Sequence, residues 1–256
     1  MLSRLTNQSL KFSSSFLHPT GNIRRNQRLK TRVNRQAILI FADPTGLDLA
    51  RRRLPRFLRP LLSWRRLQQA PASADFHLFT SGKLAALPGC KCHQQHGATF
   101  AERLEAAAAK LASLGYAEIV IVGSDCPSLT TRDVANAFAA LTTQRLVLGP
   151  DHRGGCYLIA LRAEDRALLH DVRWNRNCDY DQLRRRVASD AVLSLPVKQD
   201  IDGWADIQLL ARAGHRLAEF CMRVLVVVHA ARSGFVDLSA QAWRVRGQRP
   251  PPAWAA

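Results

Sequence analysis

The strongest constraint on the fold is a run of apolar β-branched residues in the middle of the chain. Residues 119–122 read IVIV, and Gly123 and Pro127 bound the short segment that follows them. Such a run between glycine and proline is typical of a strand buried on both faces, as in a parallel sheet. Asp125 comes directly after this strand, at the end where ligands bind in open α/β sheets. Asp125 could therefore bind a ligand, or it could cap the helix that follows.

The net charge of +17 is concentrated at the two ends of the 256-residue chain. Residues 1–42 contain eight Lys and Arg and no acid, whereas residues 43–211 are nearly balanced. This distribution makes nucleic acid an unlikely main ligand, because the basic excess lies outside the predicted folded part. The composition of the N-terminal tail resembles an organellar transit peptide, but a disordered basic extension is the favoured interpretation. No apolar run is long enough for a membrane span, and we expect a cytoplasmic protein.

Strand and helix patterns alternate over about 175 residues around the central run. This alternation predicts a layered α/β domain with a mostly parallel sheet. We expect one domain at 37–213, a disordered basic extension at 1–36 and a partly ordered basic extension at 214–256. Strands are predicted at 37–42, 76–79, 119–122, 145–148, 156–161 and 192–195, two short helices within 47–69, and further helices at 99–114, 132–141, 164–170, 179–187 and 205–213.

Acidic residues follow several of these strands and could meet at one edge of the sheet. Asp43, Asp125, the loop 149–155 and the pair Asp200 and Asp202 all lie at strand ends or in the loops after them. Carboxylate oxygens are preferred ligands of Mg²⁺ or Mn²⁺, with water and diphosphate oxygens filling the remaining positions. We therefore predict a divalent cation held by Asp125 with Asp200 or Asp202. Two acids two residues apart are also common in ordinary turns.

Basic and glycine residues near these acids are candidates for substrate contacts. Arg51, Arg52 and Arg53 could neutralise phosphate, although an exposed basic helix face is the commoner interpretation. The loop 149–155 allows close approach to a ligand because glycine has no Cβ atom, and a plain strand-to-strand turn explains it equally well. Asp125 is the catalytic candidate, and the substrate-binding candidates are Asp43, Gly46, Arg51, Arg53, Arg153, Gly154 and Gly155.

Cysteine and histidine residues at 90–96 superficially resemble a zinc cluster. The CxC spacing with two close histidines is not a usual finger pattern, so a surface loop that contains thiols is the favoured interpretation. The six cysteines also lack the spacing of a disulfide framework, which indicates reduced thiols. No GxGxxG, Walker A or GxSxG sequence occurs, so the dinucleotide oxidoreductase, P-loop ATPase and α/β-hydrolase classes lose their sequence support.

Six segments, taken in order, resemble the nucleotide-diphospho-sugar transferase-type domains labelled radical-SAM/selenodomain-associated transferase (domain of unknown function 2064). The resemblance spans about residues 37–211. It implies a GT-A fold, which is a Rossmann-like three-layer α/β sandwich, with a nucleotide or nucleotide-sugar pocket. It also implies that Asp125 is the metal-proximal acid and that Asp200 and Asp202 lie near it. The matching segments are LIFADPTG (39–46), GATFAERL (97–104), IVIVGSDCPSLT (119–130), LVLGPDHRGGCYLIAL (146–161), VRWNRN (172–177) and DIDGWADI (200–207).

Two motifs of this family differ in the chain. Many members carry PGxxKTRL after the first strand, and residues 44–54 lack its Lys-Thr-Arg pattern. Members also carry DGGYY where this chain has Arg153 at the position of the acid. The sequence predicts a metal-dependent, glycosyltransferase-like transferase with a nucleotide-sugar donor and an acceptor that the sequence does not identify. The alternatives are a nucleotidyltransferase of the same fold that releases pyrophosphate, and a catalytically silent nucleotide-binding module.

Overall fold

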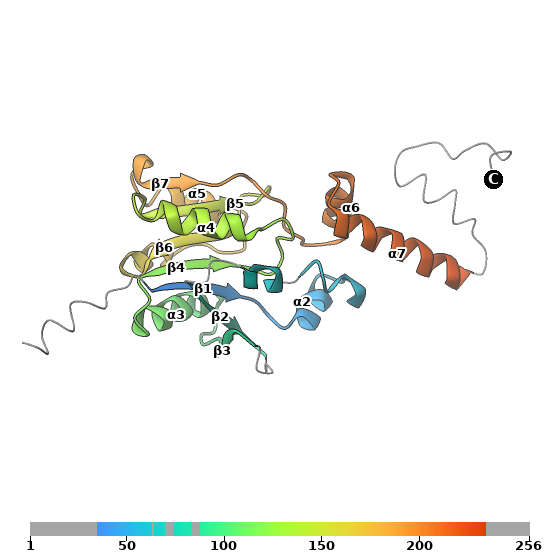
Figure 1. Cartoon of the computed structure of the whole chain (residues 1–256), viewed down its shortest axis with the longest axis horizontal. Helices are drawn as coiled ribbons and strands as arrows, with labels where there is room; N and C mark the ends of the chain where they lie inside the picture. Colours follow the sequence, from blue (N-terminus) through green and yellow to red (C-terminus); the bar gives the residue numbers. More distant parts are fainter. Residues whose placement is uncertain (1–34, 63, 70–73, 83–87, 234–256) are drawn as a thin grey trace, which may run out of the picture. The chain divides into compact units, whose positions relative to one another are not determined.

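A seven-stranded sheet lies at the centre of the region that the structure describes (Figure 1). This computed structural model describes residues 35–62, 64–69, 74–82 and 88–233. The strands are β1 (Gln36–Phe41), β2 (Ala74–Thr80), β3 (Cys90–Gln94), β4 (Glu118–Val122), β5 (Leu146–Pro150), β6 (Cys156–Arg162) and β7 (Val192–Ser194). Their order is β3-β2-β1-β4-β6-β5-β7, and among these seven strands β6 alone is antiparallel to its neighbours. The predicted mostly parallel sheet is confirmed.

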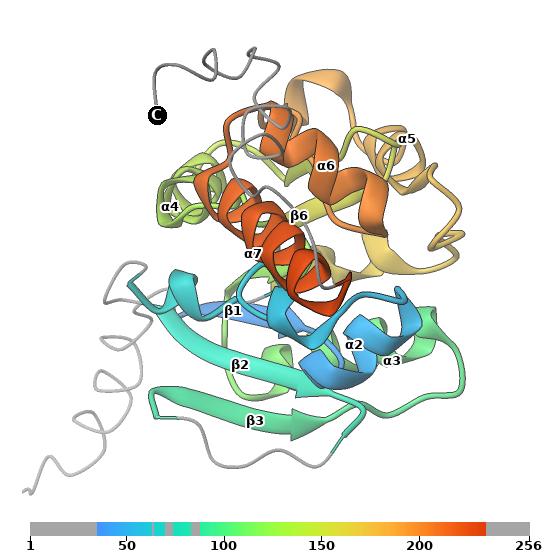
Figure 2. The same ribbon diagram turned by 90° about the vertical axis from the view of Figure 1, so that its right-hand side faces the viewer.

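Helices pack on both faces of the sheet and complete a three-layer, Rossmann-like α/β fold (Figures 1 and 2). The fold class predicted from the sequence is therefore confirmed. Short 3₁₀ helices lie at Arg56–Leu58, Trp64–Gln69, Ala163–Leu169 and Ser189–Ala191. The α-helices are α2 (Thr45–Arg51), α3 (Phe100–Ser113), α4 (Thr131–Ala140), α5 (Asp179–Arg184), α6 (Trp204–Arg212) and α7 (Arg216–Ser233).

Alternating side chains of the central strands pack in two hydrophobic layers, because successive residues of a strand point to opposite faces. Val120 and Val122 of β4 pack in the same layer as helix α4. Ile119 and Ile121 pack in the layer that contains the buried residues of α3. All four side chains are at most 5% exposed. The apolar run at 119–122 is therefore buried on both faces, as predicted.

Helix α3 begins with a capping box that the sequence predicts. The Oγ1 atom of Thr99 accepts a hydrogen bond from the backbone N–H of Glu102 at 3.2 Å, and the Glu102 carboxylate accepts one from the backbone N–H of Thr99 at 3.4 Å. Helix α4 has an equivalent box made by Thr130 and Asp133. These caps begin both helices next to the edge of the sheet where β1 and β4 end.

Strand β3 corrects the prediction of a surface loop at 90–96. Its sequence CKCHQ has no apolar alternation, and the strand forms through parallel backbone pairing with β2. The His93 ring also stacks on Phe79 of β2, with ring centroids 4.6 Å apart. Cys90 and Cys92 project to the opposite face from His93, because they lie three residues and one residue away from it on a strand. The potential metal-binding groups among the described residues do not include these side chains.

A third hydrophobic cluster joins α6 and α7 to the segment around α2. Leu49 and Leu58 pack with Ile207 of α6 and with Ala218 and Cys221 of α7. Figures 1 and 2 both show α6 and α7 side by side. The predicted disordered tail, apart from residues 35 and 36, and the end of the predicted C-terminal extension after residue 233 lie outside the described residues.

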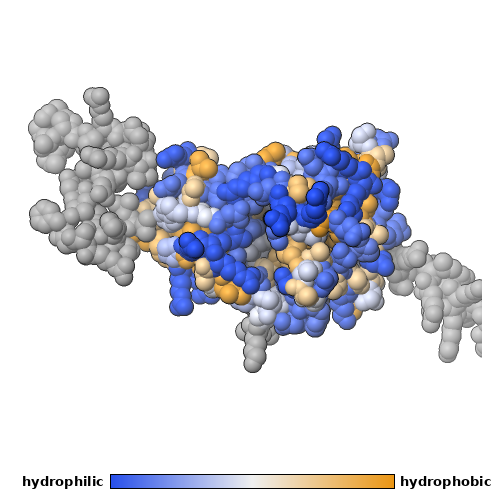
Figure 3. All heavy atoms as spheres, turned by 180° about the vertical axis from the view of Figure 1, so that it is seen from behind, coloured by the Kyte–Doolittle hydropathy of each residue, from blue (hydrophilic) through white to orange (hydrophobic). Residues whose placement is uncertain are grey.

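The surface in Figure 3 is mostly hydrophilic, with apolar side chains in scattered positions. Within the described ranges, none of the helices combines the length and the hydropathy that a membrane crossing requires.

Candidate functional site

A cavity of about 700 Å³ lies at the edge of the sheet where β1 and β4 end. The loop 151–155 between β5 and β6 reaches the same edge, because β5 is parallel to β4 across the intervening β6. Helix α2 and the first turn of α3 contribute further lining residues. Most of the wall therefore comes from segments that follow strands, as expected for an open α/β sheet.

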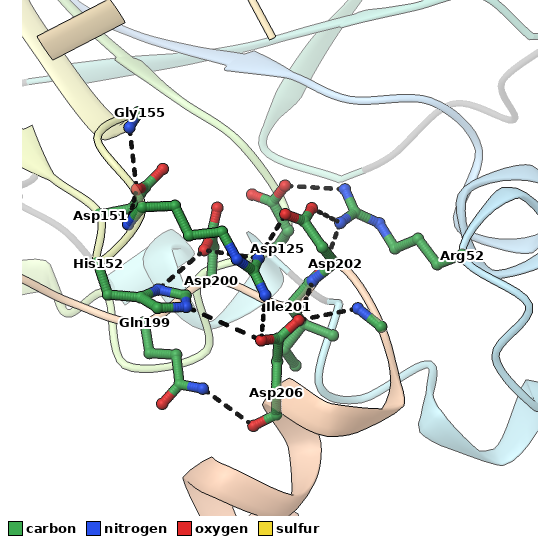
Figure 4. A network of polar contacts seen from close by, with 12 residues as sticks. Arg52, Asp125, Asp151, His152, Gly155, Gln199, Asp200, Ile201, Asp202 and Asp206 are labelled. Carbon is green, nitrogen blue, oxygen red and sulfur yellow. Dashed lines mark hydrogen bonds and ion pairs between the residues drawn. The ribbon is translucent and has the colours of Figure 1, made fainter. Parts of the chain in front are cut away.

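Three carboxylates converge in this cavity, and we call Asp125, Asp200 and Asp202 the acid cluster (Figure 4). One oxygen of each lies within 4.8 Å of the others. The backbone holds the two contributing loops together, because Ile201 N–H donates a hydrogen bond to the carbonyl of Asp125 at 2.9 Å. The structure thus brings together the three acids that the sequence predicts as cation ligands. Asp200 also belongs to a second such group, with Asp151 and His152.

The loop 151–155 is folded around the side chain of Asp151. Its Oδ1 atom accepts hydrogen bonds from the backbone N–H groups of Arg153 at 2.7 Å and Gly155 at 2.9 Å. Gly154 has φ +100°, and a Cβ atom there would lie 2.5 Å from the carbonyl oxygen of Asn177. Of the two predicted glycines, Gly155 lines the cavity, whereas Gly154 allows the close packing of two loops.

Arg52, the C-cap residue of helix α2, contacts the acid cluster. Its Nη2 atom lies 2.9 Å from Asp125 Oδ2, and its Nη1 atom lies 2.7 Å from Asp202 Oδ1. Its Nε atom donates to Asp48 Oδ1 at 2.8 Å. Burial opposes its charge, but the attraction of Asp125 and Asp48 raises the pKa of Arg52 above its ordinary value. The i,i+4 spacing of Asp48 and Arg52 was the sequence signal for this pair.

The other predicted residues around α2 lie at different positions. Asp43 lines the cavity and accepts hydrogen bonds from Ser81 and Arg51. Arg51 also lines the cavity, although its side chain is 60% exposed. Gly46 and Arg53 are not among the residues that line it, and Arg53 has a left-handed backbone at φ 55°. The basic contribution of this helix to the acid cluster therefore comes from the middle arginine of the three.

Arg153 bridges the acid cluster and the first turn of helix α6. Its guanidinium pairs with Asp202 and Asp206, and its Nη1 atom lies 3.9 Å from Asp200 Oδ1. Asp206 is buried, and it accepts hydrogen bonds from the backbone N–H groups of Asp202 and Gly203 at 2.9 Å each. Asp206 was missed from the sequence, although an acid at the third position of a helix that follows glycine is a capping signal.

The acid cluster is strongly negative for a site that is partly removed from water. Burial is the main cause that raises the pKa of Asp200 to about 7, and the charges of Asp125, Asp151 and Asp202 add to it. Burial also raises the pKa of Asp125, against the opposing effect of Arg52. Seven aspartates and three arginines line the cavity. Its lining therefore attracts cations and repels a free diphosphate.

A divalent cation fits this set of oxygen atoms. Asp200 Oδ1 is buried without a hydrogen-bond partner, and its nearest basic neighbour is His152 Nδ1 at 3.4 Å. An unpaired buried carboxylate oxygen beside two further carboxylates is what a hard cation such as Mg²⁺ or Mn²⁺ requires. The identity of the cation and its binding stay predictions.

Another part of the cavity wall is aromatic. Phe41 contacts Phe100 edge to face, with ring centroids 5.2 Å apart, and Phe100 lies 5.8 Å from Trp174. Asp179, at the start of α5, lines the cavity beside this wall and is 8% exposed. Burial raises the pKa of Asp179 to about 6. Neither Trp174 nor Asp179 was singled out from the sequence.

Comparisons with known proteins confirm the resemblance inferred from the sequence. Residues 63–176 match the model of a family described as "Uncharacterized protein conserved in bacteria (DUF2064)". A crystal structure from Desulfovibrio desulfuricans G20, described as a candidate nucleotide-diphospho-sugar transferase, is 25% identical, with a TM-score of 0.59. The match covers 72% of this chain and 89% of that chain. No curated protein matches the chain.

Two further solved structures are similar to this chain at lower identity. A homologue of Mycobacterium tuberculosis Rv0371c from Mycobacterium sp. strain JC1 is 16% identical, with a TM-score of 0.51, and the match covers 72% of this chain and 98% of that chain. The 4-diphosphocytidyl-2C-methyl-D-erythritol synthase of Anaerococcus prevotii DSM 20548 is 9% identical, with a TM-score of 0.49 and coverage of 72% and 97%.

Proposed function

We propose that this protein is a divalent-cation-dependent transferase that acts on a nucleotide-activated sugar. The observation that carries the proposal is the convergence of Asp125, Asp200 and Asp202 at the carboxyl-terminal edge of a mostly parallel sheet. These carboxylates open into a cavity of about 700 Å³. That volume is within the range of pockets that enclose a small-molecule ligand or cofactor, roughly 300–1,000 Å³.

The charge of the cavity explains why a cation belongs to this function. Its lining carries more aspartates than arginines, so a nucleoside diphosphate would meet net repulsion without a counter-charge. Asp125, Asp200 and Asp202 would hold the cation. When bound, it would neutralise the diphosphate and stabilise the negative charge that develops on the leaving group.

Arginines of this chain would share the neutralisation of the substrate. Arg52 contacts Asp125 and Asp202, so a cation that binds these carboxylates competes with the guanidinium for them. Arg51 is exposed at the rim of the cavity and pairs with Asp43. Guanidinium groups suit this task because their planar donor sets match phosphate oxygens.

The similarity to the Desulfovibrio desulfuricans protein supports the broader class, a transferase that uses a nucleotide. The choice of a sugar nucleotide as donor rests on the same similarity and on the cavity, which aromatic residues line together with the acid cluster.

Calorimetric titration with Mn²⁺, followed by UDP-glucose, UDP-N-acetylglucosamine and GDP-mannose, tests this function. We expect metal-dependent binding of at least one sugar nucleotide and its loss by at least tenfold in the Asp125→Asn variant. The matched control is Asp190→Asn, which changes an exposed aspartate outside the cavity lining. Equal nucleotide binding with and without Mn²⁺, or in Asp125→Asn, would contradict the proposal.

Product analysis then separates the proposed function from its alternatives. A nucleotidyltransferase would release pyrophosphate from a nucleoside triphosphate, whereas a sugar transferase releases a nucleoside diphosphate or monophosphate. Binding without turnover over a broad panel of acceptors would indicate a silent nucleotide-binding module.

A further inference from the structure

Buried polar atoms without partners are concentrated in residues that line the cavity. Among the described residues, six buried side-chain nitrogen or oxygen atoms lack a hydrogen-bond partner. Four of the six belong to lining residues, although the cavity involves a small part of the molecule. Because leaving such atoms unpaired is costly, their concentration at one place indicates that a ligand satisfies them. They are Arg103 Nε, Trp174 Nε1, Asp179 Oδ1 and Asp200 Oδ1.

The proposed cation accounts for Asp200 alone among these four. The remaining three belong to other lining residues, and one of these, Trp174, packs against Phe100 at 5.8 Å between ring centroids. Arg103 and Phe100 come from the same turn of helix α3. The indole N–H and the guanidinium N–H are donors, and the Asp179 oxygen is an acceptor. A ligand here therefore needs both hydrogen-bonding capacity and an apolar face.

We propose that Trp174, Asp179 and Arg103 form the subsite for the sugar ring of the donor. This inference rests on the proposed function and names the part of the substrate that this wall recognises. A sugar ring presents C–H groups to an aromatic face and hydroxyl groups around its edge. These hydroxyl groups can accept from Trp174 Nε1 and Arg103 Nε and can donate to Asp179 Oδ1.

The position of Asp179 favours the sugar over the nucleobase. Asp179 begins helix α5 beside the loop 151–155, because the backbone N–H of its neighbour Tyr180 donates to the carbonyl of Gly154. Asp151 of that loop and Asp200 of the acid cluster have side-chain oxygens within 4.8 Å of one another. The loop 151–155 therefore adjoins both groups, and the Asp179 subsite lies near the place where the diphosphate would bind. The sugar is attached directly to the diphosphate, whereas the base is one ribose further away.

The segment that carries Trp174 and Asp179 is fixed to the loop that carries Asp151. The backbone N–H of Tyr180 donates to the carbonyl of Gly154 at 3.2 Å. Gln182 accepts a hydrogen bond from the backbone N–H of Arg173 at 3.0 Å. The subsite is thus held in place before a ligand binds, which lowers the entropic cost of binding.

Paired titrations of nucleoside diphosphates and their sugar conjugates test this assignment. We would compare UDP with UDP-glucose and UDP-N-acetylglucosamine, and GDP with GDP-mannose, each in the presence of Mn²⁺. In the wild type, we expect the sugar to strengthen binding by at least fivefold for one pair. In Trp174→Ala this gain should fall to less than twofold, while binding of the nucleoside diphosphate alone stays within twofold of wild type.

Two further variants sharpen the result. Trp174→Phe keeps an aromatic face and removes the N–H, so an intermediate gain is expected. Phe220→Ala removes a 61% exposed aromatic ring on α7 and should leave the gain unchanged. The thermal midpoint of each variant verifies that it is folded.

Three outcomes would overturn the subsite. In the first, the strengthening of binding by the sugar persists in Trp174→Ala. In the second, it is absent for every pair in the wild type. In the third, Trp174→Ala weakens the binding of UDP and UDP-glucose equally, which would assign the wall to the nucleotide. If the wild type binds no nucleotide at all, the proposed function fails separately. Saturation-transfer NMR with free glucose, N-acetylglucosamine and mannose then decides. Sugar signals that disappear in Trp174→Ala uphold the subsite, and their absence in the wild type overturns it.

Discussion

Two polar clusters border the same sheet, and they differ in how their charges are balanced. The histidine cluster lies between β2, β3 and the start of β4 and consists of Asp75, His77, Lys91, His93 and Tyr116. Lys91 Nζ lies 3.0 Å from Asp75 Oδ2, Tyr116 Oη donates to the same carboxylate, and His77 Nδ1 lies 2.9 Å from His93 Nε2. One buried atom, His77 Nε2, stays unpaired.

The acid cluster has the opposite character. Its carboxylates repel one another, burial raises the pKa of Asp200 to about 7, and it opens into the cavity. No residue of the histidine cluster lines that cavity. A polar cluster with balanced charges outside a cavity stabilises the fold, whereas unbalanced charge at a cavity favours the binding of a ligand. We therefore infer a structural role for the first cluster and propose a binding role for the second.

The largest effect is expected from Tyr116→Ala in the histidine cluster. Tyr116 is 2% exposed, the Arg35 guanidinium lies 4.3 Å from its ring centroid, and the His77 ring packs against its edge. Truncation of a buried aromatic side chain typically lowers the free energy of unfolding by about 3–5 kcal/mol. Chemical denaturation measures the loss, and Mn²⁺ binding at low temperature should stay within twofold of wild type. A large change in Mn²⁺ affinity of the folded variant would contradict the comparison.

Acid should weaken the histidine cluster through His77. Burial, with a further contribution from His93, lowers the pKa of His77 to about 4 from an ordinary value of 6.5. The unfolded chain therefore binds more protons between these values, and stability falls as the pH drops from about 6.5 to about 4. The shift corresponds to about 3 kcal/mol, because one pKa unit is about 1.4 kcal/mol.

The His77→Phe variant keeps a buried ring and removes the titration. Its free energy of unfolding should vary less between pH 6.5 and 4 than that of wild type, as measured by urea denaturation across this range. Parallel pH profiles of the two proteins would exclude His77 as the source.

Removal of one carboxylate from the acid cluster should weaken metal binding without lowering the stability of the fold. In Asp200→Asn, one proposed cation ligand is lost, and the Mn²⁺ dissociation constant should rise by roughly tenfold to a hundredfold, which is about 1.4–2.8 kcal/mol. The variant without metal should be at least as stable as wild type, because the asparagine side chain is neutral and is not repelled by Asp125, Asp151 and Asp202 as the wild-type carboxylate is. Calorimetry and thermal unfolding measure the two quantities. A destabilised variant with unchanged Mn²⁺ affinity would make Asp200 a structural acid.

The strands and the meeting of distant acids could be predicted from the sequence, because both depend on local patterns. The apolar runs at 37–42 and 119–122 specify buried strands whichever neighbours they pair with. Asp125, Asp200 and Asp202 were expected together because they follow strands whose ends meet at one edge of a parallel sheet. Strand β3 was missed because CKCHQ pairs through its backbone and carries no apolar alternation.

The direction of individual side chains was not predictable in the same way. Arg52 rather than Arg53 reaches the acid cluster because α2 ends at Arg51 and Arg53 takes a left-handed backbone. Trp174 and Asp179 reach the cavity through a loop in which Asn175 and Asn177 have φ values of 58° and 53°. These conformations are set by tertiary packing, and no periodic pattern in the sequence encodes them.

The smallest effect is expected from Asp179→Asn. The pH dependence of stability that Asp179 causes is opposite in sign to the one that His77 of the histidine cluster causes. Burial raises the pKa of Asp179 to about 6, above the ordinary value of 3.8, so the folded protein binds the extra proton between these values. Its stability contribution is present at low pH and is lost as the pH rises from about 4 to about 6. Asparagine resembles the protonated acid at all pH values, and its one side-chain oxygen can keep the hydrogen bonds that the carboxyl group accepts from the backbone N–H groups of Asn175 and Arg176. We therefore expect the variant to be more stable than wild type at pH 7.5 and to match it near pH 4, as measured by urea denaturation. A variant that is less stable than wild type at pH 7.5 would mean that Asp179 Oδ1 also has a partner in the fold, and the ligand-binding role of this wall would lose its support.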